Sequence, residues 1–372
     1  ELYFQHTPDG GNTEYFTDVV GRVAFSQNSK QRPDSNYSYT LHDKLGRVIE
    51  TGRVKLNCSG QCDFVTNAHK YVVDTLTSYI RHLDRYEVVQ TFYDTATINL
   101  AGVSGYKLSE QENLFNRVSA ILYYESKSND HNATSIPAPF FGTYYSYDMV
   151  GNVKTITYEC MALDHLRQKF KRVDYDFDQI SGKVNMFSYN RGMPDQLFHK
   201  YKYDADNRII EVKTSKDGVI WNRDAAYEYY KHGPLASTKI GDAQLQSIEY
   251  AYTIQGWLKA INGDILKPDK DMGQNGKPGD MTYARDVMAM ALNYFQNDYA
   301  PIDNTVMVTN LPEHNKSLFN GNIARQTMSL NTFGSLQRTY RYDQVQRLKL
   351  ATYAPVDEDN MTVASPSDIY KN

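Results

Sequence analysis

A short segment built from tyrosine, aspartate and glycine recurs along this chain and constrains its fold. The clear copies are Thr17–Val23, His42–Val48, Tyr147–Val153, Tyr203–Ile209 and Tyr342–Leu348, and the looser copies are Phe177–Val184, Tyr229–Leu235 and Tyr252–Leu258. Between 147 and 252 the copies begin at residues 147, 177, 203, 229 and 252, at intervals of 30, 26, 26 and 23 residues. Such self-similarity marks a repeat architecture, in which no single unit can bury its own apolar face.

Each copy has the residue pattern of a β-hairpin. Tyr201 and Tyr203 share one face of a strand, because side chains alternate with period two. Aspartate is favoured at the first position of a type I turn, and the fourth position needs a residue that tolerates a left-handed backbone. That fourth position holds Gly21, Gly46, Gly151, Gly233, Gly256 or Asn207. Gln346 departs from the pattern and predicts a strained turn or one of another type.

We expect the repeat motif to be structural. Its predicted residues are Asp43, Gly46, Arg47, Tyr147, Asp148, Gly151, Tyr203, Asp204, Asn207, Arg208, Tyr252, Gly256, Tyr342, Asp343 and Arg347.

The motif resembles the YD repeats of bacterial Rhs proteins, which also occur in the Tc-toxin C subunit and in teneurins. Longer stretches that look like Rhs sequence are Asp195–Arg208, Gln255–Asn262 and Leu318–Ile323, and the resemblance covers most of residues 14 to 350. It implies a mainly β fold of consecutive antiparallel hairpins in one curved or spiralling sheet, part of a hollow β-cocoon around a toxic C-terminal domain. Nothing in the chain matches the Asp-Pro-x-Gly-Leu signature of the family's self-cleavage region, so neither the protease nor the toxin is carried over.

Charge and hydropathy exclude two classes of partner. The net charge is −4 and no basic stripe is present, which argues against nucleic acid. No apolar run is long enough to cross a bilayer, and no signal peptide is visible. The resemblance implies a secreted or bacterial cell-surface location. Residues 1–5 resemble the remnant of an engineered protease site, and we expect the natural sequence to begin near His6, inside a larger gene product.

We expect YD-repeat hairpins over 6–66 and 87–261, interrupted by a helical insertion over 67–86. Asn67 is an acceptable N-cap for that helix, and its apolar face carries Val72, Leu76, Tyr79, Ile80 and Leu83. Residues 262–335 are expected to hold a long loop and an insertion hairpin, and 336–372 the final repeat and tail.

The long loop over 262–282 is rich in Asp, Gly, Lys and Pro and is predicted to be exposed and mobile. Asp264, Asp269, Asp271 and Asp280 are an alternative calcium set, although their spacing matches no EF-hand. Residues 288–295 fit helix or strand by periodicity, and we favour a strand that leads into a hairpin.

Cysteine is sparse, and its use stays open. Cys58 and Cys62 are placed to close a small disulfide loop if the protein is exported, and the pair without further ligands does not predict zinc. Cys160 is expected to be a buried hydrophobic residue.

The sequence carries little that predicts catalysis. No His-x-His, His-Glu-x-x-His or Gly-x-Ser-x-Gly motif is present. Asp174, Asp176 and Asp178 would line one face of a strand about 7 Å apart, within the range for a glycosidase, but in a single row that favours a solvated face. We therefore expect no enzyme activity, no cofactor and no metal.

The leading functional interpretation is a wall segment of an Rhs-type shell that encloses or displays an effector. Its expected partners are the rest of the shell, the C-terminal effector and, through open sheet edges, further copies of the chain. The alternative is a cell-surface adhesion or glycan-binding module. An exposed aromatic row facing a groove would favour the alternative, and tyrosines buried between strands would favour the shell.

Overall fold

The computed structural model describes residues 3–8, 11–56, 62–96, 111–128, 139–243, 245–267, 270–275, 283–301, 317–357, 362–363 and 367–371. The chain divides into two compact units. Unit 1 comprises Glu1–Phe177 and Phe187–Gln196, and unit 2 comprises Asp178–Met186 and Leu197–Asn372. Strand β11 (Val184–Tyr189) spans the division.

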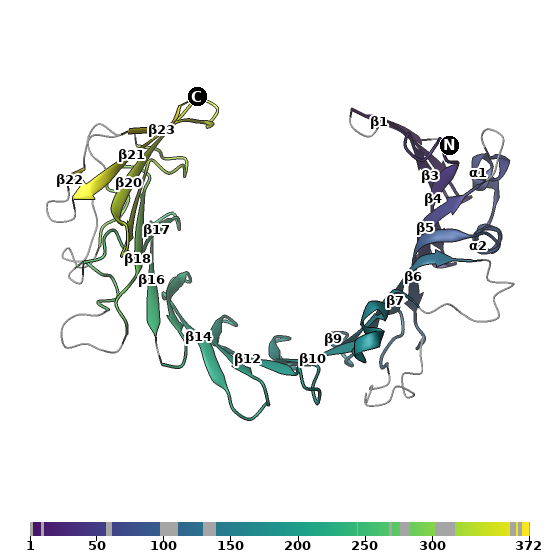
Figure 1. Cartoon of the computed structure of the whole chain (residues 1–372), viewed down its shortest axis with the longest axis horizontal. Helices are drawn as coiled ribbons and strands as arrows, with labels where there is room; N and C mark the ends of the chain where they lie inside the picture. Colours follow the sequence, from purple (N-terminus) through teal and green to yellow (C-terminus); the bar gives the residue numbers. More distant parts are fainter. Residues whose placement is uncertain are drawn as a thin grey trace. The chain divides into compact units, whose positions relative to one another are not determined.

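In unit 1, strands that follow one another in the sequence pair antiparallel, from β1 to β10 (Figure 1). Their bounds are β1 Tyr3–Thr7, β2 Gly11–Thr17, β3 Val23–Asn28, β4 Asn36–His42, β5 Val48–Lys55, β6 Arg85–Tyr93, β7 Val118–Lys127, β8 Phe141–Tyr147, β9 Val153–Cys160 and β10 Phe170–Phe177. Strand β1 includes Tyr3–Gln5, residues that resemble the remnant of an engineered protease site.

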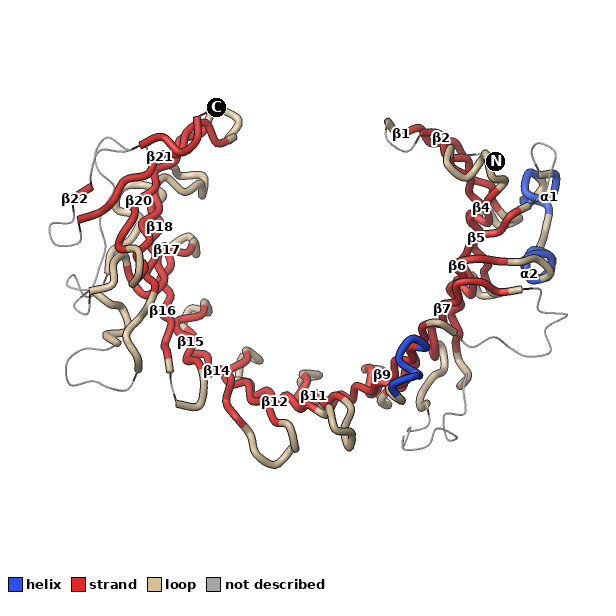
Figure 2. Tube along the Cα trace, in the orientation of Figure 1, coloured by secondary structure: helices blue, strands red, loops and turns tan. Residues whose placement is uncertain are grey.

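Unit 2 follows the same rule from β12 to β21, and β21 also pairs with β22 and β23. The bounds are β12 Leu197–Tyr203, β13 Ile209–Ser215, β14 Asn222–Tyr229, β15 Leu235–Ile240, β16 Gln246–Tyr252, β17 Leu258–Gly263, β18 Met288–Asn293, β19 Arg325–Leu330, β20 Gly334–Tyr342, β21 Leu348–Asp357, β22 Thr362–Val363 and β23 Ser367–Lys371. The sheet of each unit curves along its length (Figure 2). The prediction of a mainly β fold made of consecutive antiparallel hairpins is confirmed.

A hydrophobic core lies where helices cover strands β2 to β5 in unit 1 (Figure 1). Every second residue of β4 is buried, so that Tyr37, Tyr39 and Leu41 face the core. Leu76 and Ile80 of helix α2 (Val73–Arg81) pack into the same core.

The predicted helix over 67–86 is wrong in its bounds. The segment holds α1 (Asp63–Thr66), a 3₁₀ turn η1 (Ala68–Lys70) and α2, and β6 begins at Arg85. Asn67 is the C-cap of α1 and does not cap α2. The apolar periodicity correctly predicted that Leu76 and Ile80 are buried, but pairing of β6 with β5 ends the helical segment before residue 86. A second 3₁₀ segment, η3, spans Met161–Leu166.

The prediction of an exposed loop after β17 is wrong for its described part. Asp264, Ile265, Asp271 and Asn275 are buried. Met272 of this segment packs, together with Tyr299, against a small-residue patch of Ala251, Ala260 and Ala291. Asp269 and Asp280 lie outside the described residues.

Residues 288–293 form strand β18, as predicted, but β18 does not lead directly into a hairpin. Its partner β19 begins only at Arg325. Cys62 is buried and disulfide-bonded, while Cys58 lies outside the described residues. Cys160 is a free thiol and only half-buried. No helix in the described part of the chain has the length and apolar character to span a bilayer.

Candidate functional sites

The repeated turn has the same backbone geometry in most of its copies, and the turn at Asp178 is one residue longer. In the turn at Asp43, the Gly46 amide donates to the Asp43 carbonyl at 3.0 Å, and the Asp43 amide donates to the Arg47 carbonyl at 2.8 Å. The paired strands shift register by one residue between Leu41 and His42, which is a β-bulge. Gly46 has φ 86°, the left-handed conformation predicted for this position. The same backbone bonds close the turns that begin at Asp18, Asp204 and Asp343.

The aspartate carboxylate holds the turn from inside. Asp204 Oδ1 accepts the amides of Asp206 and Arg208, and Asp204 Oδ2 accepts Arg208 Nε at 2.8 Å. These bonds stabilise the charged form, so the pKa of Asp204 lies below its ordinary value, with the Arg208 amide as the largest cause. The pKa of Asp43 is also lowered: burial opposes the shift, and bonds from Arg47 outweigh it. In the turn at Asp148, Asn152 takes the place of the arginine, and its Nδ2 donates to Asp148 Oδ2 at 2.9 Å.

Gln346 adopts the geometry of the glycine it replaces. Its φ is 65°, and its amide donates to the Asp343 carbonyl at 3.1 Å. The turn is therefore not of another type. Of the two expectations, the strained turn remains, because a non-glycine residue adopts the left-handed conformation. The turn Tyr252–Leu258 substitutes Thr253 for aspartate, and Thr253 Oγ1 accepts the Trp257 amide at 3.2 Å.

In six repeats, the tyrosine before the turn bonds its hairpin to the preceding one. Its hydroxyl donates to the carbonyl of the first residue after the preceding turn. The pairs are Tyr93–Val48 at 3.0 Å, Tyr147–Val118 at 2.8 Å, Tyr203–Val184 at 2.8 Å, Tyr229–Ile209 at 2.8 Å, Tyr294–Leu258 at 2.8 Å and Tyr342–Ile323 at 3.1 Å. We call this bond the inter-repeat tyrosine bond.

The arginine that ends a turn covers the same tyrosine ring. Arg47 lies 4.3 Å from the centroid of Tyr93, Arg117 lies 5.3 Å from Tyr147, and Arg208 lies 4.5 Å from Tyr229. Arg47 Nη2 also donates to Asp94 at 2.8 Å. These contacts place the tyrosines and arginines in bonds between successive hairpins, where they stabilise stacking of the repeats.

Two of these repeats were missed in the sequence. Tyr93 and Val118 belong to one repeat whose halves are separated, and the Asp94 amide donates to the Arg117 carbonyl at 3.1 Å. Tyr294 and Ile323 belong to another, closed near Gly321, which has φ 86°. The signals present were Tyr93-Asp94, Asn116-Arg117-Val118 and Gly321-Asn322-Ile323, each holding only half a motif.

The aspartate row over residues 174–178 does not form a single site. Asp174 pairs with Arg172 at 2.5 Å and accepts Thr155 Oγ1 at 2.9 Å. Asp176 is exposed. Asp178 begins the next turn and accepts the Ser181 amide at 2.6 Å. Two of the three carboxylates are therefore occupied by structural bonds.

Buried ion pairs occur in both units. In unit 1, Glu50 accepts bonds from Tyr39, Arg85 and Gln90, each at 2.7 Å. Burial, followed by the charge of Glu50, raises the pKa of Tyr39 above its ordinary range. In unit 2, Lys259 Nζ donates to Asp298 at 2.7 Å, and burial lowers the pKa of Lys259. These groups contact their partners inside the sheet and serve packing.

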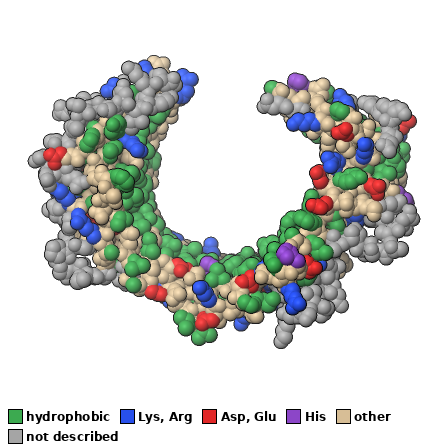
Figure 3. Space-filling model, viewed as in Figure 1, with side chains coloured by type: hydrophobic (Ala, Val, Ile, Leu, Met, Phe, Trp, Pro, Cys, Tyr) green, Lys and Arg blue, Asp and Glu red, His purple; other side chains and the backbone are tan. Residues whose placement is uncertain are grey.

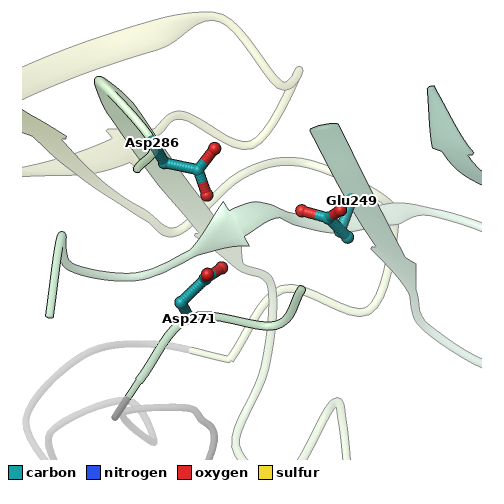
Figure 4. A group of neighbouring side chains, drawn as sticks. All are labelled: Glu249, Asp271 and Asp286. Atoms are coloured by element: carbon teal, nitrogen blue, oxygen red, sulfur yellow. The ribbon is translucent and has the colours of Figure 1, made fainter. Parts of the chain in front are cut away.

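A different carboxylate group gathers in unit 2. Glu249, Asp271 and Asp286 each place an oxygen within 4.8 Å of the others (Figure 4). Glu249 lies on β16, whereas Asp271 and Asp286 lie between β17 and β18. We call this group the β16 acidic cluster. Of the calcium set considered from sequence, it contains only Asp271.

No family model matches this chain, and no curated protein matches its sequence. Among solved structures, it is similar to TcdB2-TccC3 without the hypervariable C-terminal region, at 10% identity and a TM-score of 0.35, over 97% of this chain and 18% of that chain. It is similar to the Photorhabdus luminescens Tc holotoxin pore at 13% identity and a TM-score of 0.28, over 98% of this chain and 16% of that chain. It is also similar to a porin-like protein from Bacteroides uniformis, at 7% identity and a TM-score of 0.26, over 80% of this chain and 91% of that chain.

This chain spans less than a fifth of the length of those two Tc-toxin chains. Scores this low do not establish a shared fold.

Proposed function

We propose that this chain is a wall segment of an Rhs-type shell, secreted or on a bacterial surface, which encloses or displays an effector. The observation that carries the proposal is the inter-repeat tyrosine bond, which recurs from Tyr93 to Tyr342. It joins hairpin to hairpin in six repeats. A chain whose repeated tyrosines join successive hairpins is suited to forming a surface.

The hairpin tips offer contacts to further parts of such a shell. Large apolar side chains stand at the turn tips, with exposures of 75% for Leu45, 91% for Met149, 98% for Ile180 and 95% for Ile254. Figure 3 shows hydrophobic side chains at the surface among charged ones. We infer that these recurring exposed side chains are where further parts of the shell dock. In this proposal the remaining shell segments cover them, and the chain has no turnover of its own.

The glycan-binding alternative is disfavoured by the state of the tyrosines. Sugar-binding aromatic residues need a free ring face, and the rings of Tyr93, Tyr147 and Tyr229 each have an arginine over them. Tyr147 is also buried. Their hydroxyl groups donate to the backbone of the neighbouring hairpin. The repeated tyrosines are thus used within the sheet.

Light scattering against protein concentration, run beside a glycan-binding and hydrolysis screen, tests this proposal. We expect association that rises with concentration, because sheet edges and apolar tips seek partners, and we expect no glycan binding or hydrolysis. Ile254→Asp should weaken the association, and Asp206→Asn, an exposed polar change at another turn tip, should not. A strictly monomeric chain whose hydrolytic activity disappears in Asp176→Asn would overturn the proposal in favour of an enzyme.

A further inference from the structure

The β16 acidic cluster concentrates negative charge in a buried place. Asp271 and Asp286 are buried, and Glu249 is half-buried. Neither Glu249 nor Asp286 forms an ion pair with a lysine or arginine of the described residues. Burial, followed by the charges of Asp271 and Glu249, raises the pKa of Asp286 to about 7. Burial is also the largest cause that raises the pKa of Glu249. Charges placed together in this way require a proton or a cation.

One oxygen of the cluster lacks a hydrogen-bond donor. Asp286 is 5% exposed, and its Oδ2 atom is fully buried and meets no amide, hydroxyl or cationic donor of the described residues; the hydrogen-bonding contact of this carboxyl group within the cluster is with Asp271, itself a carboxylate. Its other oxygen, Oδ1, accepts Gln246 Nε2 at 3.5 Å, a long bond. Figure 4 shows the Asp286 carboxylate directed toward the carboxylates of Asp271 and Glu249. A buried acceptor without a donor is costly, and a metal ion directed at it would remove that cost.

The surroundings hold the other two carboxylates in place. Asp271 accepts the amide of Gly273 at 3.1 Å and the amide of Asn275. Glu249 accepts Ser247 Oγ and, at 3.5 Å, Asn275 Nδ2. Gly273 leaves room for the Glu249 carboxylate, because a Cβ atom there would lie 2.5 Å from the Glu249 carboxyl carbon and would displace it. The carboxylates are thus oriented before any ligand arrives.

We propose that Glu249, Asp271 and Asp286 bind one divalent cation, and that Ca²⁺ is the ion that fits. Ca²⁺ takes six to eight oxygen ligands in a flexible geometry, and each of the three carboxylates offers one or two oxygens, with water completing the shell. Mg²⁺ demands a stricter octahedron and gives up its water less readily. Bound there, the ion would fasten the segment between β17 and β18 to strand β16. This inference is independent of the shell proposal.

A small cavity adjoins the cluster, and Lys267 and Arg285 help to line it. Arg285 donates to the Leu266 carbonyl. The positive charges of the Lys267 and Arg285 side chains would oppose binding of the metal ion if they turned toward it.

Isothermal titration calorimetry of the whole, chelator-treated chain with CaCl₂ at pH 7.5 tests the proposal. We expect one site per chain with a dissociation constant of about 10⁻⁶ to 10⁻³ M. Asp286→Asn and Glu249→Gln should each weaken binding about tenfold or more, since each removes a charged ligand. Glu125→Gln, which changes an exposed carboxylate on β7, is the matched control and should bind as the unchanged chain does.

A second measurement covers variants that fail to fold. The melting temperature of the unchanged chain should rise with CaCl₂ at pH 7.5. Absence of both calorimetric heat and a calcium-dependent melting shift would overturn the proposal. So would a folded Asp286→Asn variant that binds CaCl₂ as tightly as the unchanged chain, because the site would then lie elsewhere.

Discussion

The covered strands β4 and β5 and the bare strands β12 to β15 use the same turn motif but differ in what stabilises them. In the covered region, helix α2 closes a core in which Tyr39, Val54 and Ile80 are at most 2% exposed. In the bare region, most residues of β13 and β14 are only half-buried, and no helix of the described residues packs on them. The difference teaches that the motif itself does not require a core. In the bare region, polar bonds between hairpins replace apolar packing.

The largest loss in the free energy of unfolding should come from breaking the buried ion pair of the covered region. Glu50→Gln should cost about 3 to 5 kcal/mol, because it leaves Arg85 buried beside a neutral partner. Chemical denaturation measures the change in the free energy of unfolding. Glu87→Gln, at an exposed carboxylate 3.7 Å from Arg53, is the control and should change stability by less than about 1 kcal/mol. Equal effects of the two substitutions would contradict the assigned burial.

Removal of an apolar side chain should give the second-largest difference in stability between the covered and the bare region. Ile80→Ala should cost about 2 to 5 kcal/mol, since Ile80 is 0% exposed and packs in the core. Ile210→Ala on β13 should cost about 1 kcal/mol, because that side chain is only half-buried. Thermal melting of both variants checks the order. A larger loss for Ile210→Ala would show that the bare sheet has an apolar partner.

The turn glycines should have an intermediate effect. Gly151 has φ 111°, and an added Cβ atom would lie 2.8 Å from Arg117 Nη2, so Gly151→Val should cost about 1 to 3 kcal/mol. Gly256 has φ 82° with open space around it, so Gly256→Val meets only the backbone strain and should cost less. Denaturant midpoints compare the pair. A melting point for Gly151→Val equal to that of the unchanged chain would refute the turn assignment.

The smallest effect should come from one inter-repeat tyrosine bond. Tyr229→Phe keeps the ring under Arg208 and removes only the hydroxyl that donates to Ile209, so it should cost about 0.5 to 1.5 kcal/mol. In the Tyr229→Phe variant, amide hydrogen exchange should become faster in β13 and β14 by more than it does in β4 and β5. Uniform destabilisation of both regions would show that the bond is not local.

Arg47→Ala should lower the melting temperature more than loss of an exposed arginine, because Arg47 bonds both Asp43 and Asp94.

The sequence predicted what local chemistry determines and missed what distant segments bring together. Asp43, Gly46 and Arg47 lie within one turn, so their geometry follows from residue preference alone. Tyr93 and Val118 belong to one repeat, but the intervening residues hide that relation. Glu249, Asp271 and Asp286 meet only because the segment after β17 folds back onto β16, which no spacing rule reports. The limits of α2 were missed because pairing of β6 with β5 overrides helical periodicity.

Protease protection tests the central claim most directly. The shell proposal implies a longer gene product that encloses a C-terminal effector domain; such a product would be treated with a broad-specificity protease, and the survival of the effector domain would be followed over time. If the hairpins form a wall, that domain should be cut far more slowly than the same domain alone. A Glu50→Gln wall, expected to be weaker, should shorten the protection. Equal cleavage rates for the enclosed and the isolated domain would contradict the account.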